Sequence, residues 1–305
     1  MKKISVIMIT YNHEKYIEKA VDSVLMQEGN FELELLIGND KSPDRTAEIL
    51  KKYENDSRVK IFNREKNMGA TKNGLDIKLK STGDYIAVLE GDDYWVTKDK
   101  LSKQLEILEN NEDVVLCYSD SYVVDENNNI TGKKCVKPNC ISNFNSLIVN
   151  RVHIPTGTII YKNIFKNGNN INKIKKLLTS SEIVGDLSTF VMMINEGKFY
   201  KLDEFTGAYR YITNSTSYSS KKLLYQENET YKVMKAICDY CGLKGINKFL
   251  LLKRAEYKLL KEIKKENKNE KEFLNSNELK GMFIYKLIKP FDDLRLSINK
   301  KTYSK

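Results

Sequence analysis

The sequence lacks several features that define common classes of protein. None of its apolar runs approaches the ~18 residues of a membrane-spanning helix, and no secretory signal peptide is recognisable. Its five cysteines are odd in number and irregularly spaced, which is not the pattern of a disulfide framework. Its two histidines and its lone Cys-x-x-Cys pair do not make a metal-ligand cluster. We therefore expect a cytosolic protein that folds without disulfides.

The positive charge of the chain is not accompanied by a recognisable DNA- or RNA-binding motif. The formal net charge is +10, of which residues 243–305 carry +9 and residues 1–242 carry +1. Residues 246–264 combine lysines with an apolar stripe, and residues 282–291 add aromatic side chains. Two interpretations stay open: a helix packed on the rest of the protein, or attachment to an anionic membrane surface. Nucleic acid is not an expected partner.

Short apolar runs alternate with helical patterns over the first 90 residues. The run ISVIMI at residues 4–9 is typical of a strand buried on both faces of a sheet. The alternation predicts further strands at 33–38, 59–62 and 84–89, and helices at 14–27, 44–54 and 70–80. It indicates an α/β fold with a doubly wound, mostly parallel sheet. In such a sheet, ligands bind at the carboxyl ends of the strands.

The pattern changes after residue 100. We expect a helix at 101–111, two antiparallel strands within 113–134, a helix at 183–196, and one or two strands at 199–211. Residues 163–176 are rich in Asn and Lys and are interpreted as a surface loop. Beyond residue 220 the period is helical almost to Pro290.

Polar clusters follow three of the predicted strands and should meet at one edge of the sheet. They are TYNHE at 10–14, GNDKSPD at 38–44 and EGDDYW at 90–95. The adjacent carboxylates of Asp92 and Asp93 repel each other, and such oxygen donors suit a hard divalent cation. A solvated turn is the alternative interpretation. A second acidic cluster on the same edge, Asp40 and Asp44, favours the cation.

Four stretches of the chain, in this order, resemble the family 2 glycosyltransferases, which have the A-type nucleotide-sugar transferase fold. The stretches are residues 4–27, 35–50, 67–95 and 100–111. The resemblance is close over residues 1 to about 120 and weaker up to 217. It implies a catalytic domain at 1–218, with a nucleotide-sugar-binding half at 1–120 and an acceptor-binding half at 121–218. A basic helical C-terminal extension at 219–305 would follow.

The resemblance implies roles for residues at the nucleotide end. In similar enzymes the turn after the first strand, here Thr10, Tyr11 and Asn12, packs around the base and ribose. The residue matching Asp40 bonds the uracil imide of a UDP-sugar. Asn39 stands where the family usually has Asp, which leaves the base preference open.

The pair Asp92 and Asp93 matches the acidic DxD-like element of the family. The resemblance implies that Asp92 contacts ribose or sugar, and that Asp93 binds a Mn²⁺ or Mg²⁺ ion bridging the diphosphate. Lys72 and Arg210 are candidates for the diphosphate itself, although an ordinary surface lysine is the alternative for Lys72. Ile212 stands where relatives often have His, which leaves a third protein ligand for the metal in doubt.

The second half of the chain must supply a general base and contacts to the acceptor. Asp186 lies at a predicted helix start and resembles the acidic motif from which the base of inverting members comes. Capping of that helix is the alternative, and the two roles are compatible. His153 and Trp95 are the candidate acceptor contacts, with a structural role as the alternative for His153.

These inferences predict a metal-dependent, inverting glycosyltransferase. It would move a sugar from a nucleoside diphosphate sugar, a UDP-sugar, to a carbohydrate or lipid-linked glycan in bacterial surface polysaccharide synthesis. The basic extension would hold it at the inner face of the plasma membrane. A sugar nucleotidyltransferase of the same fold is one alternative, although TYNHEKY lacks its Gly-rich basic loop. A non-catalytic nucleotide-sugar-binding module is the other.

Overall fold

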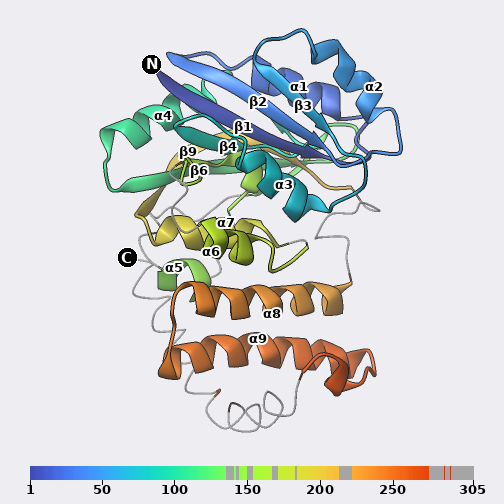
Figure 1. The fold of residues 1–305 in the computed structure, drawn as a ribbon, viewed down its shortest axis with the longest axis vertical. Coiled ribbons are helices and arrows are strands. Elements are labelled where there is room, and N and C mark those ends of the chain that lie inside the picture. Colours follow the sequence, from blue (N-terminus) through green and yellow to red (C-terminus); the bar gives the residue numbers. More distant parts are fainter. Residues whose placement is uncertain are drawn as a thin grey trace.

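The structure is a computed structural model of the 305-residue chain. It describes residues 1–134, 141, 144–149, 154–166, 171–182, 184–212, 222–274, 285 and 289. Within these residues, nine strands form a single sheet with the order β3-β2-β1-β4-β8-β6-β9-β5, and β7 pairs with β6. Figure 1 shows this sheet at one end of the molecule and two long helices, α8 and α9, at the other, with α6 and α7 between them.

The first half of the chain forms the parallel part of the sheet, as its alternating pattern predicted. Its elements are β1 (Lys2–Thr10), α1 (Ile17–Leu25), β2 (Phe31–Asn39), α2 (Thr46–Leu50), η1 (Lys51–Tyr53), β3 (Val59–Asn63), α3 (Ala70–Lys78) and β4 (Tyr85–Val88). Strand β1 pairs in parallel with β2 and β4, and β2 with β3. The strand centres are apolar because both faces of the sheet are covered. The predicted α/β class is confirmed.

The second half extends the same sheet with mixed strand directions. Its elements are β5 (Tyr94–Trp95), α4 (Lys100–Asn110), β6 (Val114–Val124), β7 (Ile130–Lys134), α5 (Phe144–Val149), η2 (Thr156–Thr158), β8 (Ile160–Lys162), α6 (Ile171–Leu178), α7 (Asp186–Ile194) and β9 (Lys198–Arg210). Strands β6 and β7 form the expected antiparallel pair, while β6 and β9 run parallel.

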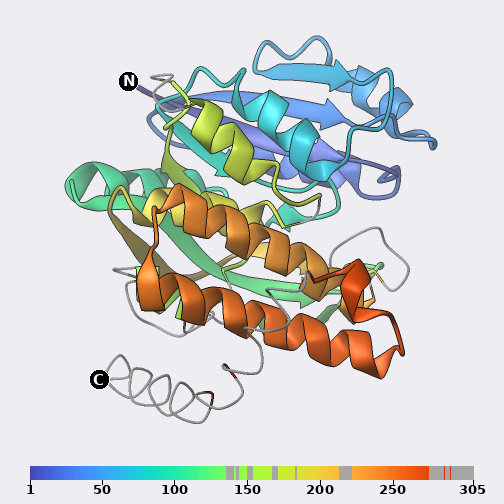
Figure 2. The ribbon, with the colours of Figure 1, turned by 60° about the horizontal axis from the view of Figure 1, so that its bottom comes forward.

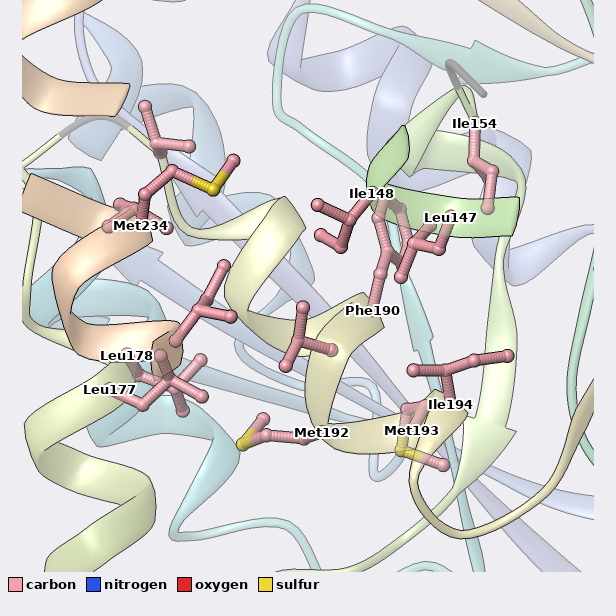
Figure 3. Close-up of a cluster of buried hydrophobic side chains, with 14 of the residues drawn as sticks. Leu147, Ile148, Ile154, Leu177, Leu178, Phe190, Met192, Met193, Ile194 and Met234 are labelled. Atoms are coloured by element: carbon pink, nitrogen blue, oxygen red, sulfur yellow. The ribbon is translucent and has the colours of Figure 1, made fainter. Parts of the chain in front are cut away.

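One local prediction was wrong. Residues 163–176 were interpreted as a surface loop, but helix α6 begins at Ile171. Its side chains Ile174, Leu177 and Leu178 are buried. Figure 3 shows Leu177 and Leu178 lying beside Met192 of α7 and Met234 of α8. The many Asn and Lys residues concealed a short apolar stripe at helical spacing, which tertiary packing stabilises.

The C-terminal elements α8 (Leu223–Tyr240), α9 (Gly245–Lys265) and η4 (Glu270–Glu272) close the apolar side of the molecule. Helices α8 and α9 lie side by side in both views (Figures 1 and 2), and α8 contacts α6 and α7. The apolar stripe of α9, including Leu259 and Ile263, is buried in the core. Packing against α8 and the core therefore accounts for this stripe. None of the described helices is both long and apolar enough to cross a bilayer.

Candidate active site

A cavity of about 300 Å³ opens at the carboxyl ends of β1 and β4, between α3 and α7. Four carboxylates line it: Glu90, Asp92, Asp93 and Asp186. Three basic side chains also line it: Lys78, Lys134 and Arg210. These residues come from five different elements or loops, which the fold brings together at one edge of the sheet.

The Asp92–Asp93 turn places uncompensated negative charge beside this cavity. The side chain of Asp93 is buried, and burial together with Asp92 and Glu90 raises the pKa of Asp93 well above its usual range. The backbone N–H of Arg210 donates to Oδ1 of Asp93 (2.7 Å). The Oδ2 atom of Asp92 lies 3.7 Å from Nε2 of His13.

The donor set at this turn fits a hard divalent cation. Two adjacent carboxylates supply oxygen ligands, and a cation would offset the repulsion that burial intensifies. Among the described residues, no three Asp, Glu, His or Cys side chains converge as a complete ligand set. A bound Mn²⁺ or Mg²⁺ would therefore need further oxygen ligands, from water or from phosphate.

Glu90, Lys78 and Lys134 were missed by the sequence analysis. Glu90 stands two residues before Asp92, and burial followed by the charge of Asp92 raises its pKa to about 7. Lys78 follows Gly74 and Thr71 on one face of α3, at a spacing that marks the cavity side. Lys134 ends β7, with its ammonium 3.2 Å from the centre of the Tyr209 ring. Only the helical spacing of Lys78 offered a signal in the sequence.

The predicted nucleotide residues lie at the same edge of the sheet. The backbone N–H of Asp40 donates to the carbonyl of Thr10 (3.0 Å). The carboxylate of Asp40 accepts from the N–H groups of Met68 (2.7 Å) and Gly69 (2.8 Å), which precede α3. Gly69 has φ 84°, a left-handed conformation that favours glycine. Asp40 is thus hydrogen-bonded both to the end of β1 and to the residues that precede α3. Its contact with the base of a nucleotide stays a prediction.

Other residues of this edge are placed more peripherally. Asn12 is exposed, has φ 63°, and its N–H donates to Oγ of Ser42 (3.1 Å). Asn39 is buried and its Nδ2 donates to Oδ1 of Asn63 (2.8 Å), so its amide joins β2 to β3. Tyr11 is half-buried beside these residues. Lys72 is exposed and does not line the cavity.

Arg210 is held by the protein itself. Its Nε donates to the carbonyl of Asp92 (2.8 Å), its Nη1 to the carbonyl of Asp125 (2.7 Å), and its Nη2 to Oδ1 of Asn128 (2.8 Å). The guanidinium also lies 4.3 Å from the centre of the Tyr16 ring. Arg210 therefore fastens the Asp92–Asp93 turn to the turn between β6 and β7, and its predicted phosphate contact stays untested.

Replacing Arg210 by methionine should lower the free energy of unfolding by ~2 kcal/mol, because a buried guanidinium loses its hydrogen bonds to the carbonyls of Asp92 and Asp125 and to Asn128. Chemical denaturation measures this change. Arg45→Met is the matched control: Arg45 is exposed and its side chain bonds Glu48, so its loss should leave the free energy of unfolding nearly unchanged. Unchanged stability of the Arg210 variant, with weaker binding of a nucleoside diphosphate, would instead support the direct phosphate contact.

Asp186 is the first residue of α7 and lines the same cavity as the acidic turn. Its Oδ1 accepts from the N–H of Leu187 (2.7 Å), so it also bonds the helix start. Helix α7 is held rigidly because its side chains pack on several sides, as Figure 3 shows for Phe190, Met193 and Ile194. A carboxylate on such a helix has a well-defined position.

Trp95, one of the two predicted acceptor contacts, is not among the residues that line the cavity. Trp95 is 1% exposed in the core, and its Nε1 donates to the carbonyl of Gly157 (2.6 Å). The structure thus places Trp95 behind the cavity wall, where burial keeps its ring from an acceptor. His153 lies outside the described residues, as do residues 213–221 after Ile212.

The sheet, the acidic turn and the polar cavity together define the class of nucleotide-sugar transferases with the A-type fold. The sequence pattern described as Glycosyl transferase family 2 matches residues 5–168. The chain therefore belongs to this glycosyltransferase family.

Curated relatives agree with this assignment. The chain is 29% identical over 224 residues to an uncharacterised glycosyltransferase of Methanocaldococcus jannaschii, covering 72% of this chain and 73% of that protein. It is 42% identical over 106 residues to the putative teichuronic acid biosynthesis glycosyltransferase TuaG of Bacillus subtilis, covering 34% and 41%. Matches to uncharacterised mycobacterial proteins span 36% of those chains. Similarity to most of these relatives is thus confined to part of their length.

Solved structures share the fold. TarS 1–349 of S. aureus in complex with UDP-GlcNAc superposes with a TM-score of 0.61 at 20% identity, covering 85% of this chain and 72% of that chain. The mannosyltransferase PcManGT of Pyrobaculum calidifontis, in complex with GDP-Man and Mn²⁺, has a TM-score of 0.52 at 14% identity, covering 84% and 72%. At these identities the likeness concerns the fold alone.

Proposed function

We propose that this glycosyltransferase transfers a sugar from a UDP-sugar to a glycan acceptor, with a divalent metal ion and with inversion at the anomeric carbon. The observation that carries the proposal is that Asp92, Asp93 and Asp186 open onto one cavity. A metal-binding carboxylate and a general base on facing sides of a cavity are what a single displacement requires.

The residues of the chain divide the work between donor and acceptor. Asp92 and Asp93 hold the diphosphate end of the donor, where a bound Mn²⁺ or Mg²⁺ would stabilise the negative charge of the leaving group. Lys134, half-buried above Tyr209, adds positive charge on the same side. Asp186 accepts the proton of the acceptor hydroxyl as that oxygen attacks the opposite face of the sugar. No covalent intermediate is needed.

The relatives support an acceptor in a bacterial surface glycan. The name of TuaG refers to teichuronic acid biosynthesis, and that of TarS to poly(ribitol-phosphate). The GDP-Man complex of PcManGT shows that the same fold also accepts another base. We place the reaction in the cytoplasm and propose that the basic C-terminal extension, residues 219–305, attaches the enzyme to the inner face of the plasma membrane.

Nucleotide release from a panel of UDP-, GDP- and dTDP-sugars tests the donor and the metal together. We expect release from a UDP-sugar with Mn²⁺, loss of at least ~10²-fold in rate with excess EDTA, and recovery when Mn²⁺ or Mg²⁺ is restored. Full activity in EDTA would exclude a metal ion from the proposed mechanism. Binding without turnover would indicate a binding module, and diphosphate release from a nucleoside triphosphate with a sugar phosphate would indicate a nucleotidyltransferase.

A further inference from the structure

Part of the wall of the same cavity is apolar, and we call this part the apolar slot. Its walls are formed by aliphatic side chains from β1, α3, β4, the β8 entry and the end of α6, namely Ile7, Ile9, Leu75, Val88, Ile159 and Leu178. The diphosphate end of the site cannot use such a surface, because phosphate oxygens require polar partners. The slot therefore suits an apolar part of the ligand.

One cationic group reaches into this slot. Lys78 is the last residue of α3, and side chains on a helix lean toward its N-terminus. Its side chain lines the cavity together with these apolar residues, and its ammonium is attracted by the charges of Glu90 and Asp186. Within the described residues its ammonium makes no hydrogen bond or ion pair. Burial lowers the pKa of Lys78 to about 8.

One acceptor atom in the cavity also lacks a partner. Oε2 of Glu90 is buried, and no group in the described part of the chain donates a hydrogen bond to it. Gly157 faces this carboxylate: a Cβ added there would lie 3.5 Å from Oε2 of Glu90 and 3.7 Å from Oδ2 of Asp93. Buried polar atoms are normally satisfied, so an unpartnered oxygen on a cavity wall indicates that a ligand supplies the donor.

We propose that this slot recognises the acetamido group of an N-acetylhexosamine donor, and this rests on the proposed function above. The Lys78 ammonium donates to the acetamido carbonyl, Oε2 of Glu90 accepts from its N–H, and the methyl group packs on the aliphatic walls. A hydroxyl would leave the apolar walls unfilled. A carboxylate substituent would face repulsion from the four carboxylates of the cavity.

The affinities of the intact protein for UDP, UDP-glucose, UDP-GlcNAc and UDP-GalNAc, measured by calorimetry with Mn²⁺, test the inference. A site that hydrogen-bonds the N–H and the carbonyl of the acetamido group and packs against its methyl group should bind at least one of the two acetamido sugars ~10-fold or more tightly than UDP-glucose. Equal affinities for UDP-glucose and the acetamido sugars would overturn the inference. If UDP itself still binds, the proposed function would remain. Failure to bind UDP at all would overturn both.

Lys78→Met tests the residue itself, because methionine keeps the length and apolar stem but removes the donor. It should reduce the affinity for the preferred acetamido sugar about 10-fold and change those for UDP and UDP-glucose less than twofold. Lys80→Met is the matched control: Lys80 pairs with Asp76 outside the cavity, so the preference should persist. An equal loss for all ligands in the Lys78 variant would overturn the role of Lys78. If that variant does not fold, the preference of the unmodified protein still decides the inference.

Discussion

Asp93→Asn should lower kcat for sugar transfer by about 10² to 10⁴. Asparagine keeps the oxygen that accepts the backbone N–H of Arg210 (2.7 Å) but loses the negative charge that would hold the metal. Nucleotide release at saturating UDP-sugar measures the rate. A Mn²⁺ titration should show that the remaining activity requires more metal.

The same variant should not lose stability. Burial and two neighbouring carboxylates raise the pKa of Asp93 in the folded protein above its unfolded value. A carboxyl group whose pKa is raised by folding stabilises the folded protein at pH values below its unfolded pKa. This stabilisation is lost as the pH rises through its folded pKa. Ionisation of Asp93 therefore lowers the free energy of unfolding at neutral pH, and asparagine cannot ionise. We expect a thermal midpoint at pH 7.5 that is equal to or above that of the parent.

Asp113→Asn is the control for both measurements, since Asp113 is exposed and pairs only with Lys198. It should leave kcat and the metal requirement unchanged. Unchanged activity in the Asp93 variant would contradict the metal role. A fall in thermal midpoint of several degrees would instead indicate that the variant lost activity through its fold.

Asp186→Asn should lower kcat by about 10² to 10⁴ while the affinity for the UDP-sugar changes less than threefold. The base acts on the acceptor hydroxyl, so its loss should affect the chemical step and leave donor binding intact. Asparagine can still accept the N–H of Leu187, so the start of α7 is preserved. Single-turnover kinetics with donor and acceptor measure the step, and calorimetry measures donor binding.

Glu196→Gln, just beyond the other end of α7, is the matched control because Glu196 is exposed and far along the helix from the cavity. Its kcat should equal that of the parent. Weaker donor binding in the Asp186 variant, with an unchanged rate at saturation, would assign Asp186 to donor recognition instead of proton transfer.

Much of the fold follows from local sequence patterns. The apolar run at 4–9 and the helical spacing at 14–27 become β1 and α1 because a buried parallel strand and an amphipathic helix are each encoded by neighbouring residues. Helix α6 was missed since its stripe is only three residues deep among Asn and Lys, and its stability comes from contacts with α7 and α8.

The individual side-chain contacts at the site could not be predicted from local sequence patterns. Arg210 was predicted to meet a phosphate, yet its donors reach carbonyls of Asp92 and Asp125, more than 80 residues away in sequence. Trp95 was predicted at the acceptor, but its Nε1 bonds Gly157 in the core. Whether a polar side chain faces a ligand or a backbone carbonyl depends on packing between distant elements.

The sequence by itself determined most of the strand and helix order and the acidic clusters that follow the strands, because these depend on local apolar periodicity and residue type, and its motifs carried the resemblance to the family. Only the tertiary structure decided that Asp186 shares a cavity with Asp92 and Asp93, that Glu90 and Lys78 line it too, and that Arg210 braces the acidic turn. Those relations arise where strands and helices distant in sequence meet at one edge of a sheet, and no local pattern records the distance between them.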